Sequence, residues 1–218
     1  MSALLCLEDI KLCFNRNVVF EKLNFTLAEN SIVVIETGVL DGGTSLLKIC
    51  NATLSPEQGK VYFGDRLSTQ LSTNELFQQV GMQFESEGLL SMYTVLENCK
   101  LPLSFHSHLS DDVIVEQIVI LAAKFGFTHL LDKYPYQLND VQLRLANLLR
   151  LLVIAPKVFL LDEIQAGMSG ILRNSILSTL VEHLKETQRS MIMTITAGDV
   201  DSFTDTKYQI IDNRLVRS

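Results

Sequence analysis

Short apolar runs and helical patterns alternate along most of the chain. The most continuous apolar runs, typical of parallel strands buried on both faces, are residues 32–35, 80–84, 157–161 and 191–196. Weaker β patterns, the middle one alternating as a half-buried strand does, occupy residues 4–14, 18–27 and 60–64. Helical spacing occupies residues 45–50, 71–79, 111–125, 138–152 and 171–185. This alternation predicts an α/β fold.

The order of these elements predicts how the chain is organised. We expect a mostly parallel sheet flanked by helices, with an antiparallel N-terminal β-subdomain and a closing hairpin near residues 208–216. Residues 86–148 read as a helical subdomain inserted into a core of about residues 1–85 and 149–218, all within a single domain. The strand at residues 157–161 is expected to be central and to lie beside the strand at residues 32–35.

A glycine-bearing turn follows the apolar strand at residues 32–35 and leads into a helix. Strand, glycine loop and helix form the context in which backbone N–H groups cradle phosphates. The phosphate-loop template places Gly38 and Gly43 at its glycine positions, with Gly42 between them, and Ser45 at its hydroxyl position. The lysine position holds Thr44. The sequence therefore predicts a phosphate-binding loop without its usual cation.

A second phosphate-site element is the apolar strand that ends in Asp162 and Glu163. Carboxylates at the carboxyl edge of a parallel sheet lie beside a phosphate loop on the neighbouring strand. We expect Asp162 and Ser45 to hold Mg²⁺, and Glu163 to polarise an attacking water. A strand ending in Asp-Glu is weak support alone, but its position after the glycine loop strengthens the prediction.

Composition narrows the class of protein. The chain has 218 residues, 47% of them hydrophobic, and a net charge of −7, which favours a globular core and disfavours a nucleic-acid partner. No secretory signal or run of ~20 apolar residues is evident, so we expect neither export nor a membrane span. We interpret the four cysteines as reduced core thiols of a cytosolic protein, and the histidines, which share no spacing, as surface residues.

Taken in order, these motifs resemble the nucleotide-binding subunit of ATP-binding-cassette (ABC) transporters over nearly the whole length. The resemblance implies a P-loop NTPase-like fold that uses ATP and Mg²⁺. It also implies a membrane permease and a second ABC subunit, either itself or an intact paralogue, as partners. The chain is then expected in the cytoplasm, peripheral on the inner face of the cell membrane.

The resemblance also assigns roles to individual residues. Phe14 stands where an aromatic residue stacks on adenine, although a plain core position is the alternative, and Glu85 stands at the family's nucleotide-sensing glutamine. Leu89 and Leu90 correspond to the segment that faces the permease, with core packing as the alternative. The signature and dimer contacts correspond to Leu138, Asn139, Asp140, Val141, Gln142 and Gly167, and Arg150 matches an arginine on the helix behind them.

The sequence departs from that family at positions that contact nucleotide. Thr44 replaces the phosphate-loop lysine, Asp41 adds negative charge inside the loop, and Lys48, one helical turn further on, is expected to point away. The other replacements are Leu46 for a hydroxyl residue, Glu85 for glutamine, Asn139-Asp140-Val141 for Ser-Gly-Gly, Ser169 for aspartate and Ala197 for the switch histidine. We therefore expect ATP binding to be absent or weakened by ~2–4 kcal/mol.

Three functions follow from these observations. The first is a degenerate ATP-binding subunit that docks on a permease and dimerises, with impaired or absent hydrolysis. The second is an active subunit that powers transport, and residues 95–103 resemble subunits of lipid-handling and lipoprotein-releasing systems. The third is a nucleotide-sensing interaction protein outside transport. The sequence does not decide whether the chain is an enzyme or whether its partner is a second copy of itself. It also does not identify the cargo or the direction of transport.

Overall fold

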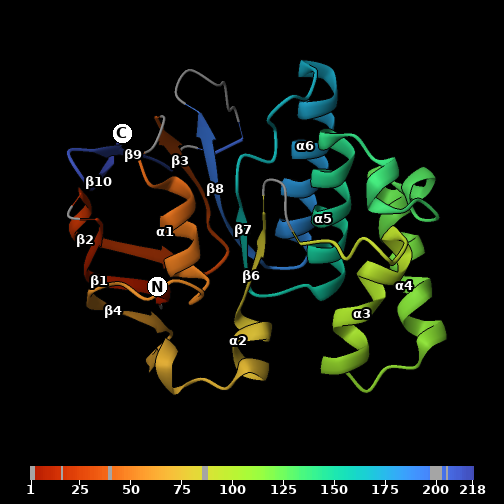
Figure 1. Cartoon of the computed structure of the whole chain (residues 1–218), viewed down its shortest axis with the longest axis horizontal. Coiled ribbons are helices and arrows are strands. Elements are labelled where there is room, and N and C mark those ends of the chain that lie inside the picture. Colours follow the sequence, from red (N-terminus) through yellow and green to blue (C-terminus); the bar gives the residue numbers. More distant parts are fainter. Residues whose placement is uncertain (1–2, 16, 39–40, 85–87, 197–202, 205) are drawn as a thin grey trace.

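Two β-sheets organise the fold in the computed structural model, which describes residues 3–15, 17–38, 41–84, 88–196, 203–204 and 206–218 (Figure 1). The first sheet is antiparallel, with strand order β2-β1-β4-β5. Its strands are β1 (Ala3–Phe14), β2 (Asn17–Ala28), β4 (Gln58–Phe63) and β5 (Arg66–Leu67). The predicted antiparallel N-terminal sheet is therefore confirmed.

The second sheet is mostly parallel and has the strand order β10-β9-β3-β8-β7-β6. Its strands are β3 (Ile32–Thr37), β6 (Val80–Gln83), β7 (Val158–Leu161), β8 (Ser190–Thr196), β9 (Lys207–Ile211) and β10 (Arg214–Arg217). Among the described strands of this sheet only the β9–β10 pair is antiparallel, and it forms the predicted closing hairpin. The prediction that β7 lies beside β3 is wrong, because β8 separates them. A continuous apolar run reveals that a strand is buried but not which strand it pairs with.

The α-helices are α1 (Gly43–Cys50), α2 (Thr73–Gln79), α3 (Val95–His106), α4 (Asp111–Phe125), α5 (Asp140–Ile154) and α6 (Gly170–Glu186). All but α3 agree closely with a predicted range, and α3 lies inside the predicted helical subdomain without a range of its own. Single 3₁₀ turns form at η1 (Ser68–Gln70), η2 (Thr128–Leu130) and η3 (Pro135–Gln137). Ser72, Thr94 and Asn139 each open an α-helix through a capping box, which satisfies backbone N–H groups that the helix itself leaves unpaired.

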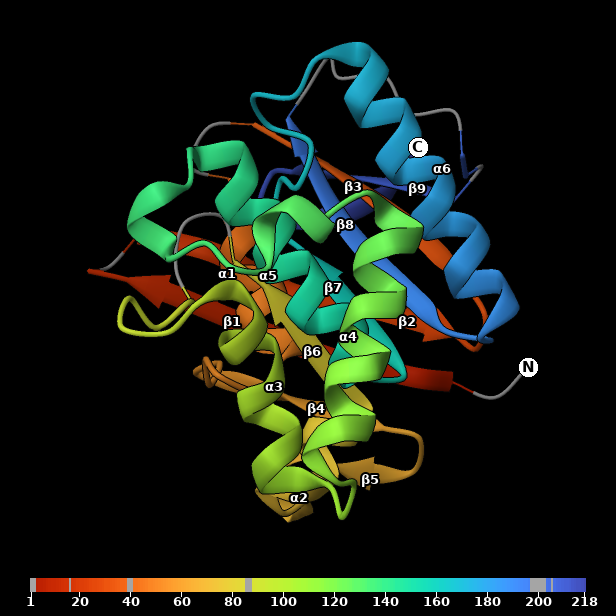
Figure 2. The ribbon, with the colours of Figure 1, turned by 90° about the vertical axis from the view of Figure 1, so that its right-hand side faces the viewer.

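Apolar residues form two cores, one on each face of the second sheet. On one face α1 lies between the two sheets, and Leu46 and Leu47 are fully buried there (Figure 1). On the other face α5 and α6 pack against the sheet, and α3 and α4 pack outside them (Figure 2). Lys124 on α4 pairs with Glu186 on α6 at 2.7 Å. The predicted subdomain boundary at residues 148–149 falls inside α5, and this subdivision stays a prediction.

The four cysteines are reduced, but they are not all core residues. Cys50 and Cys99 are buried, and burial raises the pKa of each thiol to about 12. Cys6 and Cys13 are only partly buried on β1, so the prediction that all four are core thiols is wrong for these two. Their neighbours are apolar because β1 is amphipathic, and one of its faces meets solvent.

None of the helices in the described part of the chain has the length and apolar content needed to cross a lipid bilayer.

The difference in burial predicts a difference in thiol reactivity. At about pH 8 a disulfide reagent is expected to label Cys6 in the folded protein, and Cys13 more slowly because desolvation and Glu57 raise its pKa. Cys50 and Cys99 are expected to react only after denaturation, because thiolate is the reactive form. Mass spectrometry of the labelled peptides, before and after urea, identifies the modified residues. Labelling of Cys50 or Cys99 at the same rate as Cys6 would contradict this packing.

Candidate functional site

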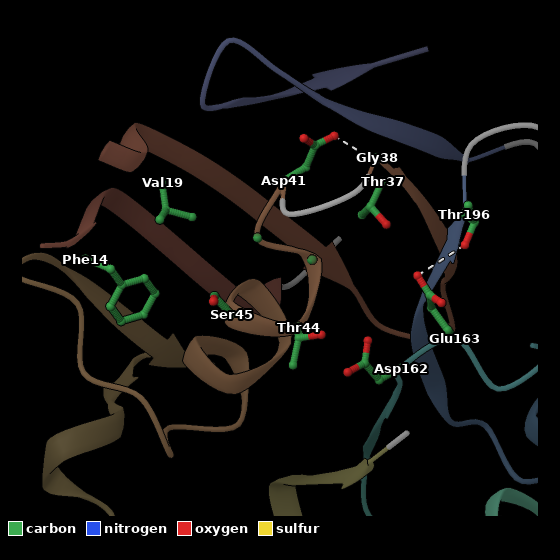
Figure 3. Close-up of a pocket in the computed structure, with 12 residues that line it drawn as sticks. Phe14, Val19, Thr37, Gly38, Asp41, Thr44, Ser45, Asp162, Glu163 and Thr196 are labelled. Carbon is green, nitrogen blue, oxygen red and sulfur yellow. Dashed lines mark hydrogen bonds between the residues drawn. The ribbon is translucent and has the colours of Figure 1, made fainter. Parts of the chain in front are cut away.

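A cavity of about 520 Å³ lies at the carboxyl edge of the parallel sheet, where β3 and β7 end and α1 begins (Figure 3). Its lining residues are Phe14, Val19, Thr37, Gly38, Asp41, Gly42, Gly43, Thr44, Ser45, Asp162, Glu163 and Thr196. The structure thus brings the glycine loop and the paired carboxylates into one cavity, as the sequence predicts. Its volume is within the range of small-molecule sites.

The glycine loop is shaped by close contacts at its base. Gly42 precedes α1 with φ +90, a conformation that residues with a side chain rarely adopt. A Cβ at Gly43 would lie 2.7 Å from the Thr37 side chain, so a larger residue would push the loop away from the sheet. The first N–H groups of α1 have no partner within the helix, and no side chain caps them. This end of the cavity is therefore favourable for an anion.

Asp41 lies in the same loop with its carboxylate fixed. Its Oδ2 accepts a hydrogen bond from the backbone N–H of Gly38 at 2.6 Å. Its own N–H donates to the carbonyl oxygen of Gly38 at 3.4 Å, which closes a turn. Among the described residues that line the cavity there is no lysine, arginine or histidine, and Lys48 is not one of them. The anion-favouring N-terminus of α1 therefore faces a cavity whose charged side chains are all carboxylates.

Threonines on β8 hold the two carboxylates that follow β7. The Thr194 hydroxyl donates to Asp162 Oδ1 at 3.0 Å and accepts the backbone N–H of Glu163 at 3.1 Å. The Thr196 hydroxyl donates to Glu163 Oε1 at 3.2 Å (Figure 3). Asp162 is nearly buried, at 4% exposure. Sequence reasoning missed these threonines, although polar residues at alternate positions of an apolar strand were a usable signal.

The donor set suits Mg²⁺ only together with other oxygen ligands. Ser45 and Asp162 both line the cavity. Within the described ranges, however, no three His, Cys, Asp or Glu side chains group closely enough to hold a metal ion by themselves. Mg²⁺ typically keeps several waters and binds through one or two carboxylates plus phosphates. The residues present therefore fit Mg²⁺ as part of a phosphate complex.

Other predicted nucleotide contacts have different outcomes. Phe14 is 46% exposed at the end of β1 and lines the cavity beside Val19, so the alternative of a plain core position is wrong. The apolar spacing of β1 did not reveal that its last residue leaves the core. Glu85 and Ala197, predicted at the sensing-glutamine and switch-histidine positions, lie outside the described residues.

The signature residues lie together at the start of α5, away from the cavity. Asn139 caps α5 by accepting the backbone N–H of Gln142 at 2.9 Å, and the Gln142 side chain accepts the N–H of Asn139 at 3.1 Å. A Cβ at Gly167 would be 3.5 Å from Val141, so the signature and the predicted dimer loop are neighbours. Leu138 packs partly buried against the core, Asp140 begins α5, and Ser169 caps α6.

The predicted permease segment is held by buried polar side chains. Asn98 is 2% exposed, and its amide accepts the N–H of Leu90 at 2.7 Å and donates to the carbonyl of Leu90 at 3.0 Å. Arg150 donates to the carbonyl of Gly88, and burial lowers the pKa of this guanidinium. Leu90 is 45% exposed, whereas Leu89 packs partly buried against the helical core. Of the two predicted contact residues Leu90 is therefore the one presented, and the neighbouring Met92 is exposed beside it.

Comparisons with known proteins find similarity to ATP-binding proteins of transport systems. A family profile described as ABC transporter matches residues 20–166. The chain is 28% identical over 217 residues to the intermembrane phospholipid transport system ATP-binding protein MlaF of Haemophilus influenzae, covering 96% of this chain and 82% of that protein. It is 34% identical over 157 residues to the methionine import ATP-binding protein MetN of Mannheimia succiniciproducens, covering 71% of this chain and 44% of that protein. The chain spans about half the length of the methionine import relatives.

Solved structures share the fold. The dimeric post-hydrolysis structure of the ATP-binding cassette MJ0796, bound to ADP and Pi, superimposes with a TM-score of 0.88 at 19% identity, covering 97% of this chain and 96% of that one. A nucleotide-free ATP-binding cassette from an ABC transporter gives a TM-score of 0.83 at 21% identity, covering 99% and 90%. The predicted fold, with its antiparallel sheet and its mostly parallel sheet flanked by helices, is therefore confirmed.

The threonine network predicts unequal stability losses. Thr194→Val removes the acceptor of the Glu163 N–H and a donor to Asp162 inside the protein, so a loss of about 1–3 kcal/mol in the free energy of unfolding is expected. Thr196→Val is the matched control, because Thr196 is exposed, and its loss is expected to stay within about 0.5 kcal/mol. Urea denaturation followed by circular dichroism measures both. Equal losses would show that Thr194 is not the anchor.

Proposed function

The chain belongs to the ABC transporter family, and from this membership we propose that it is a cassette subunit that docks on a permease, pairs with a second cassette and turns over little or no ATP. One observation carries the proposal. The charged side chains among the described lining residues of the nucleotide-type cavity are Asp41, Asp162 and Glu163, all of them acidic. A cavity with the family's shape but without a phosphate-binding cation suits assembly better than catalysis.

Without the lysine, both nucleotide binding and the positioning of the phosphates for hydrolysis are weakened. A lysine in the phosphate loop balances the β- and γ-phosphates, whereas Thr44 offers one neutral hydroxyl. Hydrogen bonds to charged groups are about twice as strong as neutral ones. Hydrolysis also requires the γ-phosphate to be held in line with the attacking water, so loss of positioning affects turnover more than binding. Glu163 can polarise a water only where that phosphate is in place.

The signature supports the same conclusion for the partner's site. In the family this segment contacts the γ-phosphate held by the opposite subunit. Here the Asn139 and Gln142 side chains bond each other's backbone N–H groups, and Asp140 would bring a carboxylate toward the phosphate. Val141 adds a side chain where close backbone approach is needed. In a dimer of two copies both halves of each composite site are then altered, and in a dimer with an intact paralogue each composite site lacks one working half.

The proposed partners follow from the family and the docking segment. We place the chain on the cytoplasmic face of the membrane, bound through the segment that presents Leu90. The phospholipid-system relative supports a lipid cargo, and the resemblance of residues 95–103 extends this to lipoprotein, whereas the methionine import relatives leave a small-molecule cargo open.

An active ATPase subunit is the second candidate. The observation that favours it is that Ser45, Asp162 and Glu163, the residues for Mg²⁺ and water, line a single cavity. A nucleotide-sensing interaction protein outside transport is favoured only if the chain has no membrane partner. Turnover and membrane recovery therefore separate the three functions.

Nucleotide titration tests the proposal directly. The purified chain is expected to bind ATP–Mg²⁺ no better than about 1 mM and to release phosphate no faster than background, because the phosphates find no cation. Thr44→Lys is expected to tighten binding by about 2–4 kcal/mol while turnover stays at background, because the signature remains altered. Calorimetry and a phosphate-release assay measure the two quantities. Micromolar binding with steady phosphate release by the native chain would establish the active candidate instead.

Membrane recovery tests the docking segment. Leu90→Asp is expected to release at least about 90% of the chain from membranes that contain its permease, because a charge in an apolar interface loses its hydration. Ile120→Asp is the matched control, because this residue is 60% exposed on α4 and lies outside the segment, so its recovery should stay unchanged. Leu89→Asp is a less specific test of docking, because Leu89 also packs on the core and its substitution also affects folding. Unchanged recovery of Leu90→Asp would place the interface elsewhere.

A further inference from the structure

The cavity has two ends of opposite chemical character. Phe14 and Val19 form an apolar end, while Asp162 and Glu163 lie across the glycine loop from them (Figure 3). Asp41 is on the loop between the two ends. From this arrangement we propose that Asp41 sets the ligand specificity of the cavity, so that it takes a nucleoside or a nucleotide of low charge and rejects a triphosphate. This inference rests on the proposed function and adds to it a ligand class.

The apolar end is built to accept a flat ring. Phe14, the last residue of the amphipathic strand β1, is 46% exposed and lines the cavity. Val19 is held against the loop, since a Cβ at Gly42 would lie 2.5 Å from the Val19 Cγ1 atom. Stacking of a base on an aromatic face needs no charge and tolerates different bases. This end therefore provides a neutral contact that the rest of the cavity does not oppose.

The carboxylates at the polar end repel phosphate groups, and the repulsion grows with the charge of the ligand. The N-terminus of α1 supplies only about half a positive charge. Three carboxylates line the same cavity, and no basic side chain among the described lining residues offsets them. Each phosphate added to a nucleoside brings more negative charge into a confined space whose walls screen it less than bulk water does. Affinity is then expected to fall as phosphates are added.

Asp41 differs from the other two carboxylates in its position. Asp162 and Glu163 lie at the far side of the cavity, where their carboxylates accept hydrogen bonds from threonine hydroxyls of β8. Asp41 belongs to the glycine loop itself, and its carboxylate accepts a hydrogen bond from the N–H of Gly38 at 2.6 Å. An asparagine at this position can accept the same N–H through its side-chain oxygen. The turn can thus be kept while the charge is removed, which makes the role of that charge testable.

A titration series on the unmodified protein is the first test. Adenosine, AMP, ADP and ATP are titrated by calorimetry in buffer without divalent cations, so that only this chain faces the phosphates. Adenosine is expected to bind at least about tenfold more tightly than ATP, and added salt is expected to narrow the ratio by screening the carboxylates. Phe14→Ala is expected to weaken the binding of adenosine. Affinity that rises from adenosine to ATP, or no adenosine binding at millimolar concentration, would overturn the inference.

Charge-neutral variants supply the second test. Asp41→Asn is expected to increase the affinity for ATP about tenfold and to leave the affinity for adenosine within about twofold of that of the unmodified protein. Glu116→Gln on the exposed face of α4 removes the same charge outside the cavity and is expected to change neither ligand. Thermal unfolding by circular dichroism confirms that each variant is folded. If both variants tighten ATP equally, net charge and not Asp41 is responsible, and the inference fails.

The inference and the proposed function can fail separately. Phosphate release by the unmodified chain would contradict the proposed function, whatever the order of affinities. Preferential ATP binding without phosphate release would contradict the inference while leaving the proposed function in place. If Asp41→Asn does not fold, the ligand series on the unmodified protein still decides the ligand class, and Asp41→Ser, whose hydroxyl can accept the Gly38 N–H, tests the charge at this position.

Discussion

The parallel register of β3, β8 and β7 is the constraint on which the cavity depends. It pairs Thr37 with Thr196 and ends β7 one residue before Asp162, so three strand ends meet at one edge of the sheet. The glycine loop can close over this edge only because Gly43 has no side chain to collide with Thr37. Thr194, from the central strand of the three, then fixes Asp162. One register thus positions the loop, the carboxylates and the hydroxyls that hold them.

The contacts that shape the fold and the charges that would meet a nucleotide belong to different residues of this chain. The first set includes the capping box at Asn139 and the hydrogen bonds from Asn98 and Arg150 to the docking segment. The charge that balances a triphosphate is absent from the described lining of the cavity, where Asp41 adds the opposite charge. The two sets act independently, because the fold is stabilised by burial and backbone hydrogen bonds, whereas nucleotide chemistry depends on charge at a few positions.

Much of the fold could be predicted from periodicity, and less of the site. Strand and helix ranges followed from apolar spacing, and Gly38, Ser45 and Asp162 from motif order. The position of β8 between β3 and β7 could not be predicted, because buried strands have nearly identical patterns. The exposure of Phe14 depends on tertiary placement, which local sequence does not encode, and the bond from Gly38 to Asp41 depends on the conformation of a short turn that the motif does not specify. Thr194 was predictable in principle from its polarity within an apolar strand.

Photoaffinity labelling of the membrane-purified complex with azido-ATP tests the central claim most directly, because it asks which chain holds ATP in the assembled state. The complex is irradiated with micromolar azido-ATP and Mg²⁺, with and without excess ATP, and the labelled peptides are identified by mass spectrometry. A chain that holds no ATP carries no ATP-competed label, while any intact cassette in the complex does. ATP-competed labelling of this chain near Phe14 or the glycine loop would show instead that its cavity binds the triphosphate.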